Sequence, residues 1–178
     1  MNLANRVTLA RIFLVPLFLT IVSMKFPYGD YLAAGVFILA ASTDGLDGYI
    51  ARKRKQVTVL GKFMDPLADK LLISAALISL VELGRLSGWV AVLIIGRELT
   101  ITGLRAIVAR DGVVVSSSGL GKIKMITQIV AIVALFLQDY PFDLLQIPLG
   151  NIAMTIAVFF TIWSGFDYFR RNWGVLTR

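Results

Sequence analysis

Long runs of apolar residues, separated by short polar segments, make up almost the whole chain. A helix needs about 20 mostly apolar residues to cross the hydrocarbon core of a bilayer. Six segments of about that length can be counted, covering residues 7–24, 31–50, 60–83, 87–108, 120–137 and 148–169. No low-complexity linker separates them, so the pattern predicts an all-α integral membrane protein, a six-transmembrane-helix bundle forming one domain over residues 1–178.

The composition is typical of a membrane protein and limits the residue types available for catalysis and metal binding. The chain is 57% hydrophobic with a mean hydropathy of +0.79, whereas soluble domains are about 45–50% apolar. It contains neither cysteine nor histidine, which excludes disulfides, thiolate chemistry, a histidine base and histidine metal ligation. Acid–base chemistry would therefore fall to carboxylates. We expect the first apolar run to be a retained helix, since no small-residue cleavage site follows it.

The charges predict how the helices are oriented. Between alternate segments the chain is strongly basic, while the other connections carry only Lys25 and Arg85 among their cations. The positive-inside rule then places both termini at the cytoplasmic face, which requires an even number of spans. The net charge of +7 favours an anionic membrane surface and anionic substrates over nucleic acid. We interpret Lys53, Arg54 and Lys55 as a topology signal in a solvated loop.

Four aspartates dominate the stretch between the second and third apolar segments. Asp44 and Asp47 are three residues apart and Asp65 and Asp69 four apart, so each pair shares one helix face. If the basic segment between the pairs turns the chain back, the two faces meet. Four converging carboxylates repel one another unless cations bind between them. All-oxygen ligands suit Mg²⁺ or Mn²⁺ rather than zinc.

The alternative is that these aspartates cap helix ends or are polar residues near the membrane interface. Asp65-Pro66 has the form of a helix start, with aspartate as N-cap and proline at the first position. Capping does not explain two acid pairs with Gly48, Arg52 and Gly61 at these intervals. Charges at membrane depth are costly and usually functional, which favours the metal-site interpretation.

A second charged group interrupts the fourth and fifth apolar segments. Arg97 and Arg105 are eight residues apart, close to two helical turns, and Lys122 and Lys124 follow a glycine- and serine-rich turn. Fixed positive charge beside such a turn suits a small phosphorylated ligand. The alternative is that these cations only set the orientation of the helices in the membrane. In that case Glu98 pairs with Arg97 or Arg105 and holds helices together.

The acidic stretch resembles the signature of the CDP-alcohol phosphotransferase family. Its fixed positions are all present at the family's spacing, and they are Asp44, Asp47, Gly48, Ala51, Arg52, Gly61, Asp65 and Asp69. The chain also resembles the branch of that family that uses glycerol 3-phosphate, and the matching positions are Asn2, Leu3, Asn5, Thr8, Arg11, Ile95, Gly96, Arg97, Glu98, Leu104, Arg105, Gly121, Lys122 and Lys124. Met125 departs from the threonine expected there, which loosens the acceptor-site assignment but not the metal site.

The resemblance implies a homodimer in a bacterial cytoplasmic membrane, two Mg²⁺ or Mn²⁺ ions and a defined reaction. CDP-diacylglycerol and sn-glycerol 3-phosphate would give phosphatidylglycerophosphate and CMP. We favour direct attack of the acceptor hydroxyl on the phosphorus attached to the lipid over a covalent aspartyl intermediate, because metal binding already occupies the acids. Metal would be bound by Asp44, Asp47, Asp65 and Asp69, with Asp69 also the base. CDP-lipid would be held by Gly48, Arg52, Thr58, Asn5 and Thr8. The acceptor phosphate would be held by Arg105, Lys122, Arg97 and Lys124.

Two other functions remain open at this stage. The same chemistry could use inositol 1-phosphate, serine or phosphatidylglycerol as acceptor, although a phosphorylated acceptor fits the basic group better than serine. A small cation transporter, with the aspartates along its ion path, belongs to another class. Against it, the acids cluster at one membrane face rather than at the midplane.

Overall fold

The computed structural model describes residues 3–24, 26–54, 59–110, 119–138 and 148–176. Within these ranges the regular elements are helices, as the apolar pattern predicts. They are α1 (Leu3–Ser23), α2 (Gly29–Arg54), α3 (Val59–Glu82), α4 (Gly88–Arg110), α5 (Gly119–Phe136) and α6 (Leu149–Leu176). Each helix overlaps one of the six predicted segments.

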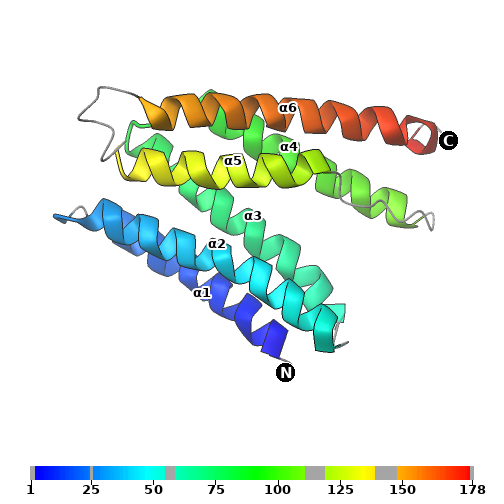
Figure 1. Ribbon diagram of the computed structural model, residues 1–178, viewed down its shortest axis with the longest axis horizontal. Coiled ribbons are helices and arrows are strands. Elements are labelled where there is room, and N and C mark those ends of the chain that lie inside the picture. The colour runs from blue at the N-terminus through cyan, green and yellow to red at the C-terminus, as the bar shows by residue number, and fades with distance from the viewer. Residues whose placement is uncertain (1–2, 25, 55–58, 111–118, 139–147, 177–178) are drawn as a thin grey trace.

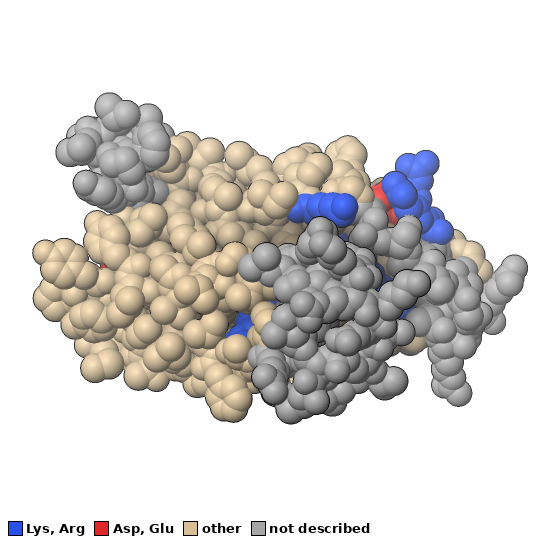
Figure 2. Space-filling view, turned by 60° about the horizontal axis from the view of Figure 1, so that its bottom comes forward, with Lys and Arg blue, Asp and Glu red and all other residues tan. Residues whose placement is uncertain are grey.

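Successive helices run in opposite directions through the bundle (Figure 1). α5 packs along α6, α1 packs against α2 and α3, and α4 packs against α3 and α6. The beginnings of α1, α3 and α5 and the ends of α2, α4 and α6 therefore lie toward one end, at the right of Figure 1. We call this the charged end, because the basic connections predicted from the sequence fall there. Figure 2 shows blue basic side chains gathered toward the same end.

An aromatic cluster holds α1, α2 and α5 together in the interior. The rings of Phe18 and Phe136 lie 5.5 Å apart in an edge-to-face arrangement, and the Phe18 and Phe37 rings lie 6.2 Å apart. All three side chains are fully buried. Small buried residues such as Ala33 and Ala157 let helix backbones approach closely, which is how helices associate where lipid offers no hydrophobic driving force.

Uncharged residues, tan in Figure 2, cover much of the face shown there. Large apolar side chains such as Phe13, Trp89 and Phe166 are at least 71% exposed. Among the described residues, 119–136 and 149–171 form helices long and apolar enough to span a membrane, and 7–23 and 29–43 are shorter apolar helices. The surface thus suits a membrane, while six spans with both termini in the cytoplasm stay a prediction.

The turn between α3 and α4 lies at the other end of the bundle. Gly84 has a φ of +72°, a conformation that glycine adopts without the strain a Cβ would bring. Its N–H donates to the Val81 carbonyl at 3.0 Å, and the Arg85 N–H donates to the Leu80 carbonyl at 2.9 Å. This pair of bonds is the Schellman motif that ends a helix. The turn directs Arg85 toward the end of α5.

Arg85 joins three elements at this end. Its Nη2 donates to Asp30 Oδ2 at 2.6 Å, and its Nη1 donates to the Phe136 carbonyl at 3.2 Å. Gln138 Nε2 donates to the same Asp30 oxygen at 2.8 Å. A cation beside the last carbonyls of a helix satisfies groups that have no partner within the helix. This contact fixes α2 and α5 to the α3–α4 turn.

The structure contradicts one alternative and one interpretation. α3 begins at Val59, within one residue of the predicted start, so the alternative that Asp65 and Pro66 start a helix is not supported, because both lie in its second turn. Proline is tolerated inside such a helix where neighbouring groups satisfy the carbonyl it cannot bind. α2 continues to Arg54, so Lys53 and Arg54 belong to a helix rather than to a solvated loop, because the helix extends beyond the apolar run. Lys55 lies outside the described residues.

Candidate active site

A cavity of about 390 Å³ opens among α3, α4, α5 and α6. Its lining is apolar on several sides, but it also carries charged side chains. Among the described residues these are Asp69, Lys70, Arg97, Glu98, Arg105, Lys122 and Lys124. Five of these seven side chains are cations, so this part of the lining favours an anion.

The cavity brings together residues that the sequence assigned to two different groups. All four predicted phosphate-binding residues, Arg97 and Arg105 of α4 and Lys122 and Lys124 of α5, contribute to its lining. Asp69, the predicted base on α3, lines the same cavity. An anion held by the basic residues would therefore share one cavity with this carboxylate. The roles of these residues remain predictions.

Asp69 is held by a residue from α1 to which the sequence analysis assigned no role in the site. The side chain of Arg11 has no exposed surface, and its Nη1 donates to Asp69 Oδ1 at 2.8 Å. Arg11 Nε donates to Thr43 Oγ1 at 3.2 Å, and Thr43 Oγ1 donates to the Ala40 carbonyl at 2.6 Å. A buried guanidinium with two fixed contacts restricts the orientation of the carboxylate that faces the cavity. An arginine within an apolar run was the available signal, since such charges pair inside the bundle.

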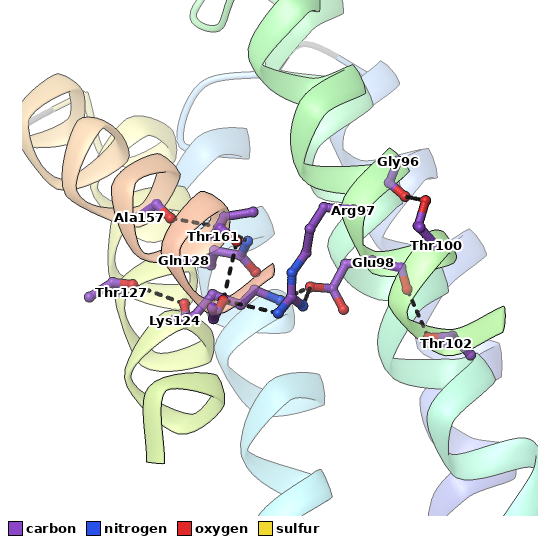
Figure 3. A network of polar contacts seen from close by, with 11 residues as sticks. Gly96, Arg97, Glu98, Thr100, Thr102, Lys124, Thr127, Gln128, Ala157 and Thr161 are labelled. Carbon is purple, nitrogen blue, oxygen red and sulfur yellow. Dashed lines mark hydrogen bonds and ion pairs between the residues drawn. The ribbon is translucent and has the colours of Figure 1, made fainter. Parts of the chain in front are cut away.

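A polar network joins α4, α5 and α6 beside the cavity (Figure 3). Arg97 Nη1 donates to Glu98 Oε1 at 3.2 Å, and Arg97 Nη2 donates to Ser164 Oγ at 2.9 Å. Lys124 forms an ion pair with the same Glu98 oxygen, and its side chain is only 8% exposed. The Arg97–Glu98 pair that the sequence analysis weighed is thus present, but it lies within α4, and the contacts that join helices are Lys124–Glu98 and Arg97–Ser164. Arg97 and Lys124 also line the cavity, so joining helices and lining the cavity are compatible.

α6 contributes to the site although no residue of its segment was predicted to do so. Its buried Tyr168 lies beneath Arg105, whose guanidinium carbon is 5.8 Å from the ring centroid. A cation over an aromatic face is stabilised by the ring quadrupole, most strongly where water is excluded. Ser164 and Tyr168 are isolated polar residues in an apolar helix, and nothing in their spacing distinguishes them from residues that only pack against neighbouring helices. Lys70 and Gln128, which also line the cavity, were missed for the same reason.

Most of the predicted metal and CDP-lipid residues cannot be judged by side-chain contacts. Asp44, Asp47, Gly48 and Arg52 lie in α2, Asp65 in α3 and Asn5 in α1, with side chains outside the described part of the structure, and Thr58 lies outside the described residues altogether. Thr8, one turn before Arg11 in α1, is buried. Among the side chains that are described, no three acidic groups gather as a metal site. α2 packs against α3, which places the two aspartate-bearing helices side by side.

The chain was compared with known proteins. A sequence model described as CDP-alcohol phosphatidyltransferase matches residues 1–163. The protein named CDP-diacylglycerol–glycerol-3-phosphate 3-phosphatidyltransferase in Bacillus subtilis (strain 168) is 47% identical over 98% of this chain and 97% of its own length. The protein of the same name in Rickettsia bellii (strain RML369-C) is 38% identical over 95% of this chain and 94% of its own. A "probable phosphatidylglycerophosphate synthase" of Mycobacterium tuberculosis (strain ATCC 25618 / H37Rv) is 41% identical, over 96% of this chain and 81% of its own.

Proposed function

Because the chain belongs to the CDP-alcohol phosphatidyltransferase family, we propose that it transfers the phosphatidyl group of CDP-diacylglycerol to sn-glycerol 3-phosphate and releases CMP. The observation that carries the proposal is the cavity in which Arg97, Arg105, Lys122 and Lys124 surround an anion site beside Asp69. Three relatives named for phosphatidylglycerophosphate synthesis match over nearly the full chain, which supports the same acceptor.

The transfer is a single displacement at phosphorus. A primary hydroxyl of the acceptor attacks the phosphorus attached to the lipid, a new P–O bond forms, and the bond to the CMP oxygen breaks. Asp69 takes the proton of the attacking hydroxyl, which makes it the general base. Arg11 is a positioning residue, because its bond to Asp69 Oδ1 restricts the rotation of the carboxylate that must meet this hydroxyl.

The cavity suits a phosphorylated acceptor better than an uncharged one. A phosphate monoester brings three strong acceptor oxygens, and charge-assisted bonds to arginine and lysine are about twice as strong as neutral ones. Lys124 is buried, so its ammonium has little water to compete with a bound anion. The contact described for Arg105 is with the ring of Tyr168 and not with a carboxylate, and this ring orients the guanidinium. Serine would leave these cations unused.

The CDP-lipid and the metal ions belong to the α2–α3 side of the site. Carboxylate oxygens are ligands that Mg²⁺ and Mn²⁺ prefer. Two such ions would be held by four residues, Asp44, Asp47, Asp65 and Asp69. When bound, divalent ions neutralise charge that develops on the diphosphate. The CDP group would contact Gly48, Arg52, Thr58, Asn5 and Thr8. The proposal includes a homodimer in a bacterial cytoplasmic membrane, with this site facing the cytoplasm.

The test is CMP release by purified protein in detergent micelles containing CDP-diacylglycerol and Mg²⁺. Glycerol 3-phosphate, inositol 1-phosphate and serine are supplied in separate reactions. Release with glycerol 3-phosphate alone is the expected result. Release only with another acceptor would keep the chemistry and overturn the acceptor. No release with any acceptor, from folded protein that binds Mg²⁺, would favour the cation-transport function instead.

The role of Asp69 has its own test. Asp69→Asn should abolish turnover while CDP-diacylglycerol still binds, because the amide cannot accept the proton. A matched control is Asp167→Asn in α6, since Asp167 pairs with the exposed Arg171 and does not line the cavity. The control should keep its activity. Equal losses of binding and turnover in Asp69→Asn would contradict the role as base.

A further inference from the structure

Gln128 is a buried polar side chain of α5 that neither the ion pairs nor the proposed phosphate contacts use. It is 2% exposed and it lines the cavity. Its Nε2 donates to Thr161 Oγ1 of α6 at 3.0 Å. Thr161 Oγ1 in turn donates to the Ala157 carbonyl at 2.6 Å. The chain of contacts can be followed in Figure 3.

These two hydrogen bonds decide which way the amide of Gln128 faces. A threonine hydroxyl has one hydrogen, and here it is donated to Ala157. Thr161 Oγ1 can then only accept from Gln128, so the amide nitrogen must face Thr161. The amide oxygen, Oε1, is on the other branch of the amide and faces away from α6. An oxygen in this position is presented to the cavity that Gln128 lines.

Two cations that line the same cavity, Arg97 and Lys124, are already engaged in other contacts. Arg97 donates to Ser164 and to Glu98, and Lys124 pairs with Glu98. Within the described part of the chain, the side-chain contact of Gln128 is its bond to Thr161. Oε1 is not one of the buried side-chain atoms that lack a partner in the described structure, so it has surface open to the cavity, where a bound ligand can donate a hydrogen bond to it.

The chemical groups of the acceptor substrate limit which of them can donate a hydrogen bond to Oε1. A phosphate dianion has only acceptor oxygens, so it cannot satisfy an amide oxygen. Glycerol 3-phosphate also carries two hydroxyls, and only the primary one reacts. The secondary hydroxyl at C2 is a donor that the transfer does not consume. Most of the charged residues that line the cavity are cations, which cannot accept a hydrogen bond, so the amide oxygen of Gln128 matches this hydroxyl.

We propose that Oε1 of Gln128 accepts a hydrogen bond from the secondary hydroxyl of glycerol 3-phosphate and thereby selects this acceptor. The inference rests on the proposed function and adds a specificity residue to it. With the phosphate held by the cations and the C2 hydroxyl held by Gln128, two points of the acceptor are fixed. The primary hydroxyl is then directed to Asp69, since two fixed points restrict the rotation of a three-carbon ligand.

The experiment compares glycerol 3-phosphate with 3-hydroxypropyl phosphate, which keeps the phosphate and the primary hydroxyl but lacks the C2 hydroxyl. CMP release by purified protein gives kcat/KM for each acceptor. The wild type should prefer glycerol 3-phosphate by about tenfold, the range expected for one hydrogen bond to a buried group. Gln128→Met should reduce this preference to about one, mainly by slowing the reaction of glycerol 3-phosphate.

Three further variants make the test independent of any one substitution. Gln128→Glu keeps an acceptor oxygen and should keep the preference, even if its charge weakens phosphate binding. Thr161→Val removes the partner that orients the amide, so the preference should fall. Gln138→Met is the matched control, since Gln138 bonds to Asp30 at the other end of the bundle and should leave the preference unchanged.

The outcomes separate this inference from the proposed function. A wild type that uses both acceptors equally, or a Gln128→Met protein that keeps the tenfold preference, would overturn the role of Gln128 and leave the proposed function intact. If Gln128→Met does not fold, an unchanged preference in Thr161→Val would overturn it, and a reduced one would support it. No CMP release with glycerol 3-phosphate from the folded wild type would overturn both.

Discussion

The ion pair between Glu98 and Lys124 offers the sharpest energetic prediction. Lys124 on α5 has an 8% exposed side chain and Glu98 on α4 a 20% exposed one. Glu98→Gln keeps the size of the side chain but removes the charge that the buried ammonium faces. Removing one partner of a fully buried pair costs about 3–5 kcal/mol. Because Glu98 is partly exposed and glutamine can still accept a hydrogen bond, we expect a loss of about 2 kcal/mol in the free energy of unfolding.

A double-mutant cycle isolates the pair. Lys124→Met removes the ammonium, so in the double variant Glu98→Gln/Lys124→Met only Arg97 loses a charged partner, and this loss is common to the single variant Glu98→Gln. Replacing both partners of a buried pair is often close to neutral, so the double variant should lose less than the sum of the single losses, with a coupling of about 2 kcal/mol. The assay is reversible unfolding in mixed detergent micelles, followed by far-ultraviolet circular dichroism at one detergent composition.

The control is an ion pair with an exposed cation. The Asp167 side chain in α6 is 20% exposed, as that of Glu98 is, but its partner Arg171 is 66% exposed, so Asp167→Asn should cost no more than about 0.5 kcal/mol. A loss in Glu98→Gln no larger than in this control, or a coupling near zero, would refute the reasoning. Either result would mean that Lys124 is stabilised by something other than Glu98.

Three further predictions follow from the contacts on either side of the cavity. Arg105→Ala should raise KM for glycerol 3-phosphate by about tenfold or more, because a charge-assisted bond is lost, and should change KM for CDP-diacylglycerol less. Steady-state kinetics with each substrate varied in turn measure both values, and an unchanged KM for glycerol 3-phosphate would disprove the prediction. Arg11→Met should lower kcat much more than KM, and Arg11→Lys should recover part of it by restoring a cation beside Asp69; equal activity of the two variants would exclude an electrostatic role. Arg85→Met should reduce stability by about 1–2 kcal/mol while kcat stays close to wild type, because its contacts with Asp30 lie far from the reacting groups; unfolding and CMP-release assays on one preparation decide this, and a fall in kcat without a loss of stability would contradict it.

The number and direction of the helices could be predicted from the sequence because both depend on local properties. The length of each apolar run sets the length of a helix, and alternating connections bring the basic residues to one end whatever the details of packing. The gathering of Arg97, Arg105, Lys122 and Lys124 follows from the same alternation, since it places the end of α4 beside the start of α5. Helix ends were less predictable, since α2 and α6 continue past the apolar runs to Arg54 and Leu176.

Contacts across the bundle could not be predicted, because they depend on how each helix is rotated about its axis. In a soluble helix one apolar stripe marks the buried face, but helices that are apolar on most faces carry no such marker. Arg11 and Asp69 are 58 residues apart, and Gln128 and Thr161 are 33 apart. Nothing local distinguishes these partners from other polar residues in apolar runs. Packing alone decided that Arg11 holds the predicted base, and that Gln128 presents an oxygen to the cavity.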